Sequence, residues 1–190
     1  RHPGAAIIYD VKCTGALQGH ILRYGGSPLM WKTGHSLIKA KMKETHAELA
    51  GEMSGHFFFA ERWFGFDDGI YAAARLLEIL AAAPDGIQAM FDTLPQLVST
   101  PELKIELNEG EQHAFIERFV AKAQFEGARI NLIDGLRADW PDGWGLVRAS
   151  NTTPVLVVRF EANDEQAIER IKRAFREQLL EINEGLLLPF

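Results

Sequence analysis

The sequence has little cysteine, no long apolar run and no excess of positive charge. Cys13 is its one cysteine, so an internal disulfide framework is excluded and a reducing compartment, the cytoplasm, is expected. No uninterrupted apolar run approaches the roughly 20 residues of a membrane-spanning helix, and the start lacks the basic-then-apolar pattern of a signal peptide. The net charge of −6 and the pI near 5.5 argue against nonspecific binding of nucleic acid or anionic membranes, because both attract basic surfaces.

The chain also lacks an initiator methionine, and its first apolar run, residues 5–9, begins close to the start. We therefore expect a piece of a longer protein. Of its 190 residues 47% are hydrophobic and 24% are charged, which is the composition of a globular protein with one large domain or two small ones.

The first half of the chain alternates short apolar runs with segments of helical spacing. Strands are predicted at residues 5–12, 28–31 and 57–60, and helices at 15–24, at 36–43 and from Asp67 or Asp68 to Leu80. This alternation predicts a three-layer α/β domain with a mixed, mostly parallel sheet.

Composition changes near residues 93–101, which contain two prolines, and we assign residues 1–96 and 97–190 to separate domains. In the second half, strands are predicted at 103–107, 129–133, 136–140, 144–149 and 155–160, and helices at 112–125 and from an N-cap at Asn163. The second domain is thus predicted to be a smaller α+β domain with an antiparallel sheet and two helices.

Three segments of the sequence together carry a family resemblance. They are Asp10–Thr14 (DVKCT), Gly51–His56 (GEMSGH) and Arg148–Pro154 (RASNTTP). In this order and at these separations they resemble the α-D-phosphohexomutases, most closely the bacterial phosphomannomutase/phosphoglucomutase family. Members of this family have four domains, so the resemblance implies most of the third domain, truncated at its N-terminus, and all of the fourth.

The resemblance also implies parts that the chain does not carry. The family has a phosphoserine in its first domain and an Asp-rich Mg²⁺ loop in its second, and this sequence contains neither a Thr-Ala-Ser-His loop nor an Asp-x-Asp-x-Asp run. Mg²⁺ ligands are therefore expected in the missing domain 2, with no metal site in this chain, and glucose 1,6-bisphosphate is expected as activator. The implied partners are a hexose phosphate substrate and the missing N-terminal domains of the same protein.

A polar loop in the second half has the groups that bind phosphate. Arg148, Ser150, Asn151 and Thr152 offer a guanidinium, hydroxyls, an amide and successive backbone N–H groups, which suit a phosphate dianion. Standing alone, the loop is more simply a polar hairpin turn. The resemblance implies that it is the phosphate clamp. Many relatives carry Glu where this chain has Thr153, a departure that removes no phosphate donor.

The segment 51–56 places a carboxylate, a hydroxyl and an imidazole between glycines that let the backbone approach a ligand. Standing alone, it is best interpreted as a loop whose Glu caps a neighbouring helix. The resemblance implies instead that Glu52 and Ser54 bind sugar hydroxyls, and that His56 is a proton shuttle or phosphate donor. A serine-hydrolase elbow is excluded, because Glu52 and His56 stand where that motif needs glycines.

Lys12 and His35 occupy strand-end and helix-start positions, where α/β sites usually lie. Without further information, Lys12 is more simply a solvated charge and His35 a local capping partner. The resemblance implies that both support catalysis together with His56. A metal site made of His35, His46 and His56 is not expected, because their spacing matches no zinc motif.

The resemblance implies a reversible shift of phosphate between O1 and O6 of mannose or glucose, through a phosphoserine and a bisphosphorylated sugar. This chain would supply sugar and phosphate binding, and it is expected to be inactive alone. Two alternatives stay open: a phosphosugar-binding module without chemistry, favoured by the missing serine and metal loops, and an aminosugar-phosphate mutase. Met53 argues against the second, because it is typical of the mannose and glucose enzymes.

Overall fold

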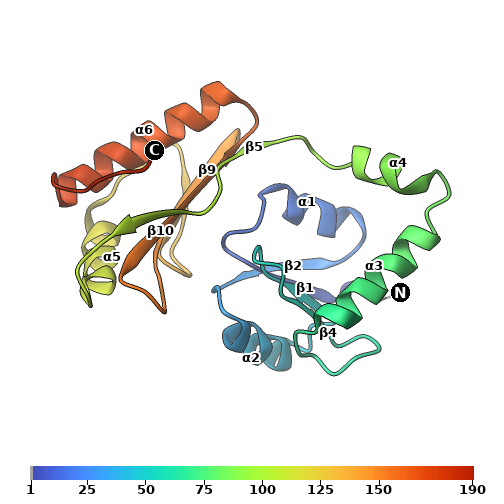
Figure 1. Cartoon of the computed structure of the whole chain (residues 1–190). Coiled ribbons are helices and arrows are strands. Elements are labelled where there is room, and N and C mark those ends of the chain that lie inside the picture. Colours follow the sequence, from blue (N-terminus) through green and yellow to red (C-terminus); the bar gives the residue numbers. More distant parts are fainter. Residues whose placement is uncertain (1) are drawn as a thin grey trace. The chain divides into compact units, whose positions relative to one another are not determined.

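The computed structural model describes residues 2–190, and the chain divides into two compact units, Arg1–Gln96 and Leu97–Phe190 (Figure 1). Each unit has its own sheet and its own hydrophobic core. Within the described residues, none of the helices combines the length and the apolar character that crossing a membrane requires.

The first unit is built on a four-stranded sheet in which three neighbouring strands are parallel. Its strands are β1 (Ala6–Asp10), β2 (Ser27–Trp31), β3 (Leu49–Gly51) and β4 (Phe57–Phe59), in the order β2-β1-β3-β4. β1 is parallel to β2 and β3, whereas β4 is antiparallel to β3. The mixed, mostly parallel sheet that the sequence predicts is confirmed.

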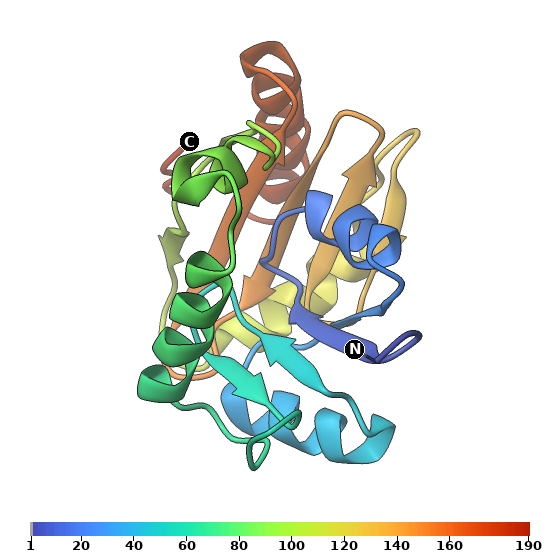
Figure 2. The same cartoon turned by 90° about the vertical axis from the view of Figure 1, so that its right-hand side faces the viewer.

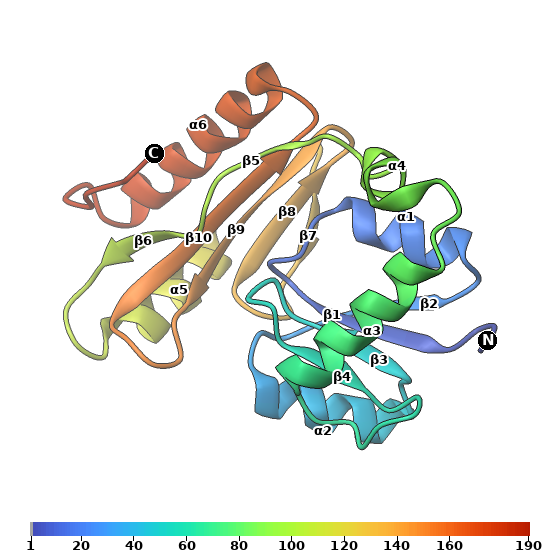
Figure 3. The same cartoon turned by 45° about the vertical axis from the view of Figure 1, so that its right-hand side comes forward.

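Helices α1 (Ala16–Arg23) and α2 (His35–Thr45) lie on opposite faces of this sheet (Figure 3). α2 buries Ile38 and Met42 in the cluster that also contains Ile8 of β1. Because β1, β2 and β3 are parallel, their carboxyl ends lie along one edge of the sheet. The loops that follow the three strands are therefore neighbours, which is the usual position of a site in an α/β sheet.

Helix α3 (Gly69–Ala81) begins at the N-cap Asp68, whose carboxylate accepts a hydrogen bond from the Tyr71 N–H at 2.9 Å. This confirms one of the two predicted starts. A further helix, α4 (Gly86–Asp92), was not predicted. Seven residues make fewer than two complete turns, too few for an apolar period to be recognised.

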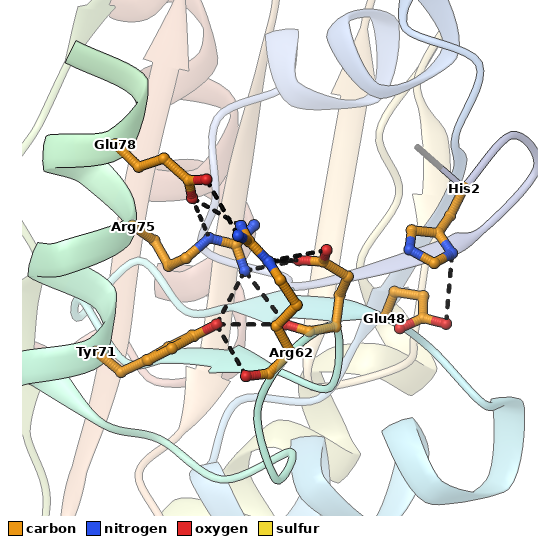
Figure 4. Close-up of polar contacts among 7 residues, drawn as sticks. His2, Glu48, Arg62, Tyr71, Arg75 and Glu78 are labelled. Atoms are coloured by element: carbon orange, nitrogen blue, oxygen red, sulfur yellow. Dashed lines mark hydrogen bonds and ion pairs between the residues drawn. The ribbon is translucent and has the colours of Figure 1, made fainter. Parts of the chain in front are cut away.

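Ion pairs and hydrogen bonds tie the loop after β4 to α3 (Figure 4). Arg75 Nη1 lies 2.7 Å from Glu61 Oε2, and Arg62 Nη2 lies 2.7 Å from Glu78 Oε2 on α3. The Tyr71 hydroxyl donates a hydrogen bond to the Arg62 carbonyl oxygen at 3.1 Å. Desolvation acts to raise the pKa of the Glu61 carboxyl, but hydrogen bonds from Arg62 and Arg75 hold that pKa below its usual range. The segment leading into α3 is therefore anchored by charge.

The second unit is an antiparallel sheet with two helices packed on it (Figure 2), and these elements share one core. Along the sheet the order is β5-β10-β9-β8-β7, and β6 also pairs with β10. The elements are β5 (Val98–Ser99), β6 (Leu103–Glu106), α5 (Glu111–Lys122), β7 (Arg129–Asn131), β8 (Leu136–Trp140), β9 (Gly143–Ala149), β10 (Val155–Ala162) and α6 (Glu165–Ile182). The predicted α+β unit is confirmed.

Helix α6 packs through the apolar stripe that its sequence spacing indicates. Ile168, Ile171, Phe175 and Leu179 are all buried, as residues three or four positions apart on one helical face should be. A Cβ atom at Gly145 of β9 would collide with the Phe175 ring. The close approach of α6 to β9 therefore requires glycine at this position.

The N-cap of α6 is Asp164, and the predicted cap at Asn163 is wrong. Asp164 has an extended backbone with a φ of −155°, and its carboxylate accepts a hydrogen bond from the Ala167 N–H at 2.8 Å. Asn163 lies one residue earlier, where its N–H donates to the Asp142 carbonyl oxygen at 2.9 Å. Asn and Asp have similar N-cap preferences, so the backbone conformation decides between these neighbours.

Candidate functional site

Asp10 joins the loops at the carboxyl ends of the three parallel strands. It is the last residue of β1 and is fully buried. Its Oδ1 accepts hydrogen bonds from the Lys12 N–H at 3.2 Å and the Met53 N–H at 3.3 Å. Its Oδ2 accepts one from the Thr33 hydroxyl at 3.2 Å. One carboxylate thus links the loops after β1, β2 and β3, a role that the sequence motif alone did not reveal.

Glu52 connects the loop after β3 to the start of α2. The residue is 6% exposed, and its Oε1 accepts a hydrogen bond from the N–H of Gly34, the N-cap of α2, at 2.5 Å. A carboxylate is favourable at this position because the helix N-terminus carries partial positive charge. This contact matches the helix-capping alternative for Glu52. This contact uses Oε1, so Oε2 is the oxygen that a ligand could use.

The segment 51–56 forms a tight turn. The Glu52 N–H donates to the His56 carbonyl oxygen at 2.9 Å, and the Gly55 N–H donates to the Glu52 carbonyl oxygen at 3.0 Å. Gly55 has a φ of 91°, in the left-handed region that a glycine adopts without strain. The turn leaves the side chains of Ser54 and His56 exposed, where a ligand could reach them.

His56 and His35, both predicted as site residues, lie together with two residues that were not predicted. Asp67 Oδ2 is 2.9 Å from His56 Nδ1, and its Oδ1 is 3.1 Å from Lys39 Nζ. The His35 ring is stacked on the His56 ring at 6.1 Å between centroids. Partial burial acts to raise the pKa of the Asp67 carboxyl, but hydrogen bonds from Lys39 and His56 hold that pKa below its usual range. Asp67 is therefore an anion at neutral pH.

Lys12 and His35 occupy the same edge of the sheet, after β1 and at the start of α2. Lys12 is 6% exposed, which excludes the alternative of a solvated surface charge. The N-cap of α2 is Gly34, with a φ of 134°, so His35 does not occupy the capping position. Lys12 belongs to a loop that Asp10 contacts, and His35 directly follows the loop that contains Thr33, another Asp10 partner.

Arg148 lies near the end of β9 and is 4% exposed. Its Nε lies 2.9 Å from Asp134 Oδ2. Gly135, with a φ of 73°, allows this close approach, because a Cβ atom there would lie 2.6 Å from the Arg148 Cα. Among residues 2–190, the buried Nη2 of Arg148 has no hydrogen-bond partner. Such a donor costs about 1–3 kcal/mol, so an acceptor that a ligand brought to Nη2 would be favourable.

The loop after β9 is organised by Ser150. Its hydroxyl oxygen accepts hydrogen bonds from the N–H groups of Thr152 at 3.3 Å and Thr153 at 3.2 Å, and it lies 2.9 Å from Thr153 Oγ1. The N–H groups expected to form an anion nest are thus partly engaged within the loop. Asn151 and Thr152 are exposed, so their side chains are accessible to a ligand.

No group of three or more His, Cys, Asp or Glu side chains in residues 2–190 is arranged to hold a metal ion. His46 ends α2 with a φ of 52°, whereas His35 and His56 stack on each other. The donor set of the described residues does not fit Mg²⁺.

Two family models match consecutive parts of the chain. "Phosphoglucomutase/phosphomannomutase, alpha/beta/alpha domain III" matches residues 1–98. "Phosphoglucomutase/phosphomannomutase, C-terminal domain" matches residues 102–178. The chain belongs to the phosphoglucomutase/phosphomannomutase family. The resemblance carried by the three sequence segments is confirmed.

Named relatives of this family match the whole chain. A phosphomannomutase/phosphoglucomutase of Pseudomonas aeruginosa is 59% identical over 190 residues, which are 100% of this chain and 41% of that protein. A phosphoglucomutase of Neisseria gonorrhoeae is 58% identical over 191 residues, with the same two shares. A crystal structure of a phosphoglucomutase/phosphomannomutase family protein from Burkholderia thailandensis has a TM-score of 0.90 and 54% identity, over 99% of this chain and 40% of that one. This chain therefore spans about two fifths of the length of these relatives.

Proposed function

We propose that this chain is the sugar- and phosphate-holding part of a phosphohexomutase that interconverts the 1-phosphate and 6-phosphate forms of mannose and glucose. The observation that carries the proposal is the buried Nη2 of Arg148, a charged donor without an acceptor among residues 2–190. The names of the relatives, phosphomannomutase and phosphoglucomutase, support the reaction. A phosphate oxygen is a strong acceptor for a guanidinium.

At the phosphate end, Arg148 would donate to the phosphate from its Nη2 while Asp134 holds its Nε. The exposed side chains of Asn151 and Thr152 would add neutral hydrogen bonds, and Ser150 would keep the loop in shape. The clamp would hold the phosphate that is not reacting. It would therefore serve both orientations of the sugar.

At the sugar end, Glu52 Oε2 would accept a hydrogen bond from a ring hydroxyl, since Oε1 is held by Gly34. Ser54 would contribute a second contact from the exposed turn. His56 would take a proton from the attacking sugar hydroxyl, and Lys12 and His35 would donate to oxygens of the transferring phosphoryl group. Positioning and charge stabilisation of this kind dominate phosphoryl transfer.

The remaining parts of the reaction would come from the upstream domains of the whole protein. A phosphoserine there would donate its phosphoryl group to the sugar and recover one from the bisphosphorylated intermediate, with glucose 1,6-bisphosphate as activator. Mg²⁺ bound in those domains would offset the charge of the transferring group. This chain would supply position, proton transfer and phosphate binding.

Isothermal titration of the full-length enzyme tests the proposal. Arg148→Ala should weaken binding of glucose 1-phosphate and glucose 6-phosphate alike, by about 30- to 100-fold, because a charge-assisted contact in a buried site is lost. Arg148→Lys should bind with intermediate affinity, because it keeps the charge but loses the fork of donors. If Arg148→Ala bound both sugar phosphates with unchanged affinity, the loop after β9 would not be part of the phosphate site.

The two alternatives predict different outcomes in an activity assay. A binding module without chemistry would bind glucose 1-phosphate but show no turnover in the full-length protein with Mg²⁺ and glucose 1,6-bisphosphate. An aminosugar-phosphate mutase would convert glucosamine 1-phosphate in preference to mannose 1-phosphate. The proposed enzyme should convert mannose 1-phosphate and glucose 1-phosphate and disfavour the aminosugar.

A further inference from the structure

The carboxylate of Asp67 lies between Lys39 of α2 and His56, the residue before β4. Asp67 receives Lys39 Nζ of α2 on Oδ1 at 3.1 Å and faces His56 Nδ1 with Oδ2 at 2.9 Å. The side chains of Lys39, Asp67 and His56 are 35%, 23% and 48% exposed, respectively. The carboxylate is thus the most enclosed member of the group, and each of its oxygens has a cationic or imidazole partner.

The contact between Asp67 and His56 has a defined backbone frame. Asp67 forms an antiparallel bridge with Phe58 of β4, the strand that begins immediately after His56. The next residue, Asp68, caps α3. On its other side the His56 ring is stacked on His35, and 6.5 Å separates its centroid from that of Phe58. The ring orientation is therefore set by the sheet, by α2 and by the start of α3.

An ionised carboxylate only accepts hydrogen bonds, so the ring nitrogen that faces it must carry a proton. A neutral imidazole carries a proton on only one of its two ring nitrogens. We infer that Asp67 is a positioning residue that keeps neutral His56 in the Nδ1–H tautomer, leaving Nε2 as the base. Lys39 contributes by occupying the other carboxylate oxygen. The inference deepens the proposed function, because it rests on His56 as the proton-transfer group.

Asp67→Asn should reverse the tautomer. The amide oxygen of the introduced asparagine would face Lys39, which is the stronger donor, and its amide NH₂ would then face His56 Nδ1. His56 Nδ1 would have to accept, and the ring proton would move to Nε2. A base that already carries its proton on the reacting nitrogen cannot take another from the sugar hydroxyl.

The tautomer can be measured directly by ¹⁵N NMR of the histidine rings in the 190-residue chain, at a pH where His56 is neutral. The parent and Asp67→Glu should show Nδ1–H, and Asp67→Asn should show Nε2–H. Asp68→Asn is the matched control, because Asn also caps helices well, and it should leave the His56 signals unchanged. Lys39→Met, which keeps Asp67, should retain Nδ1–H. The same tautomer in the parent and in Asp67→Asn would overturn the inference.

Kinetics of the full-length enzyme separate this inference from the proposed function. Asp67→Asn should lower kcat on the order of 100-fold with little change in KM, Asp67→Glu should recover part of the loss, and Asp68→Asn should match the parent. If His56→Ala keeps the parent kcat, the proposed role of His56 fails even where the tautomer result stands. If His56→Ala abolishes turnover while Asp67→Asn keeps the parent kcat, the inference fails and the proposed function stands.

Discussion

Asp10, Glu52 and Arg148 are buried charged residues that contact loops. Burying a charge is costly unless hydrogen bonds replace its hydration. For Asp10 and Glu52 the backbone N–H groups of the site loops provide those bonds, and for Arg148 a carboxylate provides one. The loops and the charges therefore stabilise each other.

The ionisation of Asp67 should make stability depend on pH. Burial acts to raise its folded-state pKa, but hydrogen bonds from Lys39 and His56 outweigh that effect and keep the pKa below the ordinary value of 3.8. The resulting stabilisation is present above the unfolded pKa and is lost as the pH falls through the lowered folded value. At pH 7, Asp67→Asn should lower the free energy of unfolding by up to about 1 kcal/mol, because the pair is partly exposed to solvent.

Urea unfolding of the parent and of Asp67→Asn at pH 7, 5 and 3 would measure this difference. The difference in the free energy of unfolding between the parent and Asp67→Asn should be largest at pH 7 and 5 and smaller at pH 3. A gap that stays constant over this range would show that the carboxylate charge does not contribute.

At the scale of elements, the apolar spacing within a helix and its packing against a strand together determine which face is buried. The stripe on α6 specifies its buried face, and Gly145 allows β9 to approach that face closely. Some short elements were not predicted from the sequence. β5 has two residues and α4 has seven, and runs of that length do not establish a period.

The start of α6 offers a test of the corrected cap. Asp164→Ala should lower the free energy of unfolding by about 1 kcal/mol, because the Ala167 N–H loses its acceptor. Asn163→Ala should change it by less than about 0.5 kcal/mol, since the contact of Asn163 with Asp142 uses the backbone N–H. Thermal or urea unfolding measures both variants. A larger loss for Asn163→Ala than for Asp164→Ala would restore the predicted cap.

At the scale of the molecule, catalysis should require more than this chain. We expect the 190-residue chain to fold but not to convert mannose 1-phosphate or glucose 1-phosphate, even with Mg²⁺ and glucose 1,6-bisphosphate. Its sequence contains no serine loop of the family type, and residues 2–190 contain no metal-binding cluster. Binding groups that act equally on substrate and transition state do not lower the barrier of the chemical step.

A coupled dehydrogenase assay would detect the product, with full-length enzyme as the positive control. Circular dichroism and a cooperative unfolding transition would show that the chain is folded in the same preparation. Turnover by the 190-residue chain that is lost in Arg148→Ala would show that the catalytic groups lie within it.

The sequence by itself determined the fold class of both units, the family and the loops that carry the candidate site. The periods of strands and helices are local properties of the sequence. The segments 10–14, 51–56 and 148–154 are each contiguous, so they can be recognised without knowing which residues contact them in space. The buried face of α6 follows in the same way from its apolar spacing.

Only the tertiary structure decided which side chains meet. Asp10 contacts Met53 across 43 residues of sequence, His56 contacts Asp67 across 11 and Arg148 contacts Asp134 across 14. No local period encodes such pairs, because they depend on which strands are neighbours and where each strand ends. The parallel order β2-β1-β3 places three loops at one edge of the sheet. This adjacency brings Asp10 and Glu52 together with the loops of the candidate site.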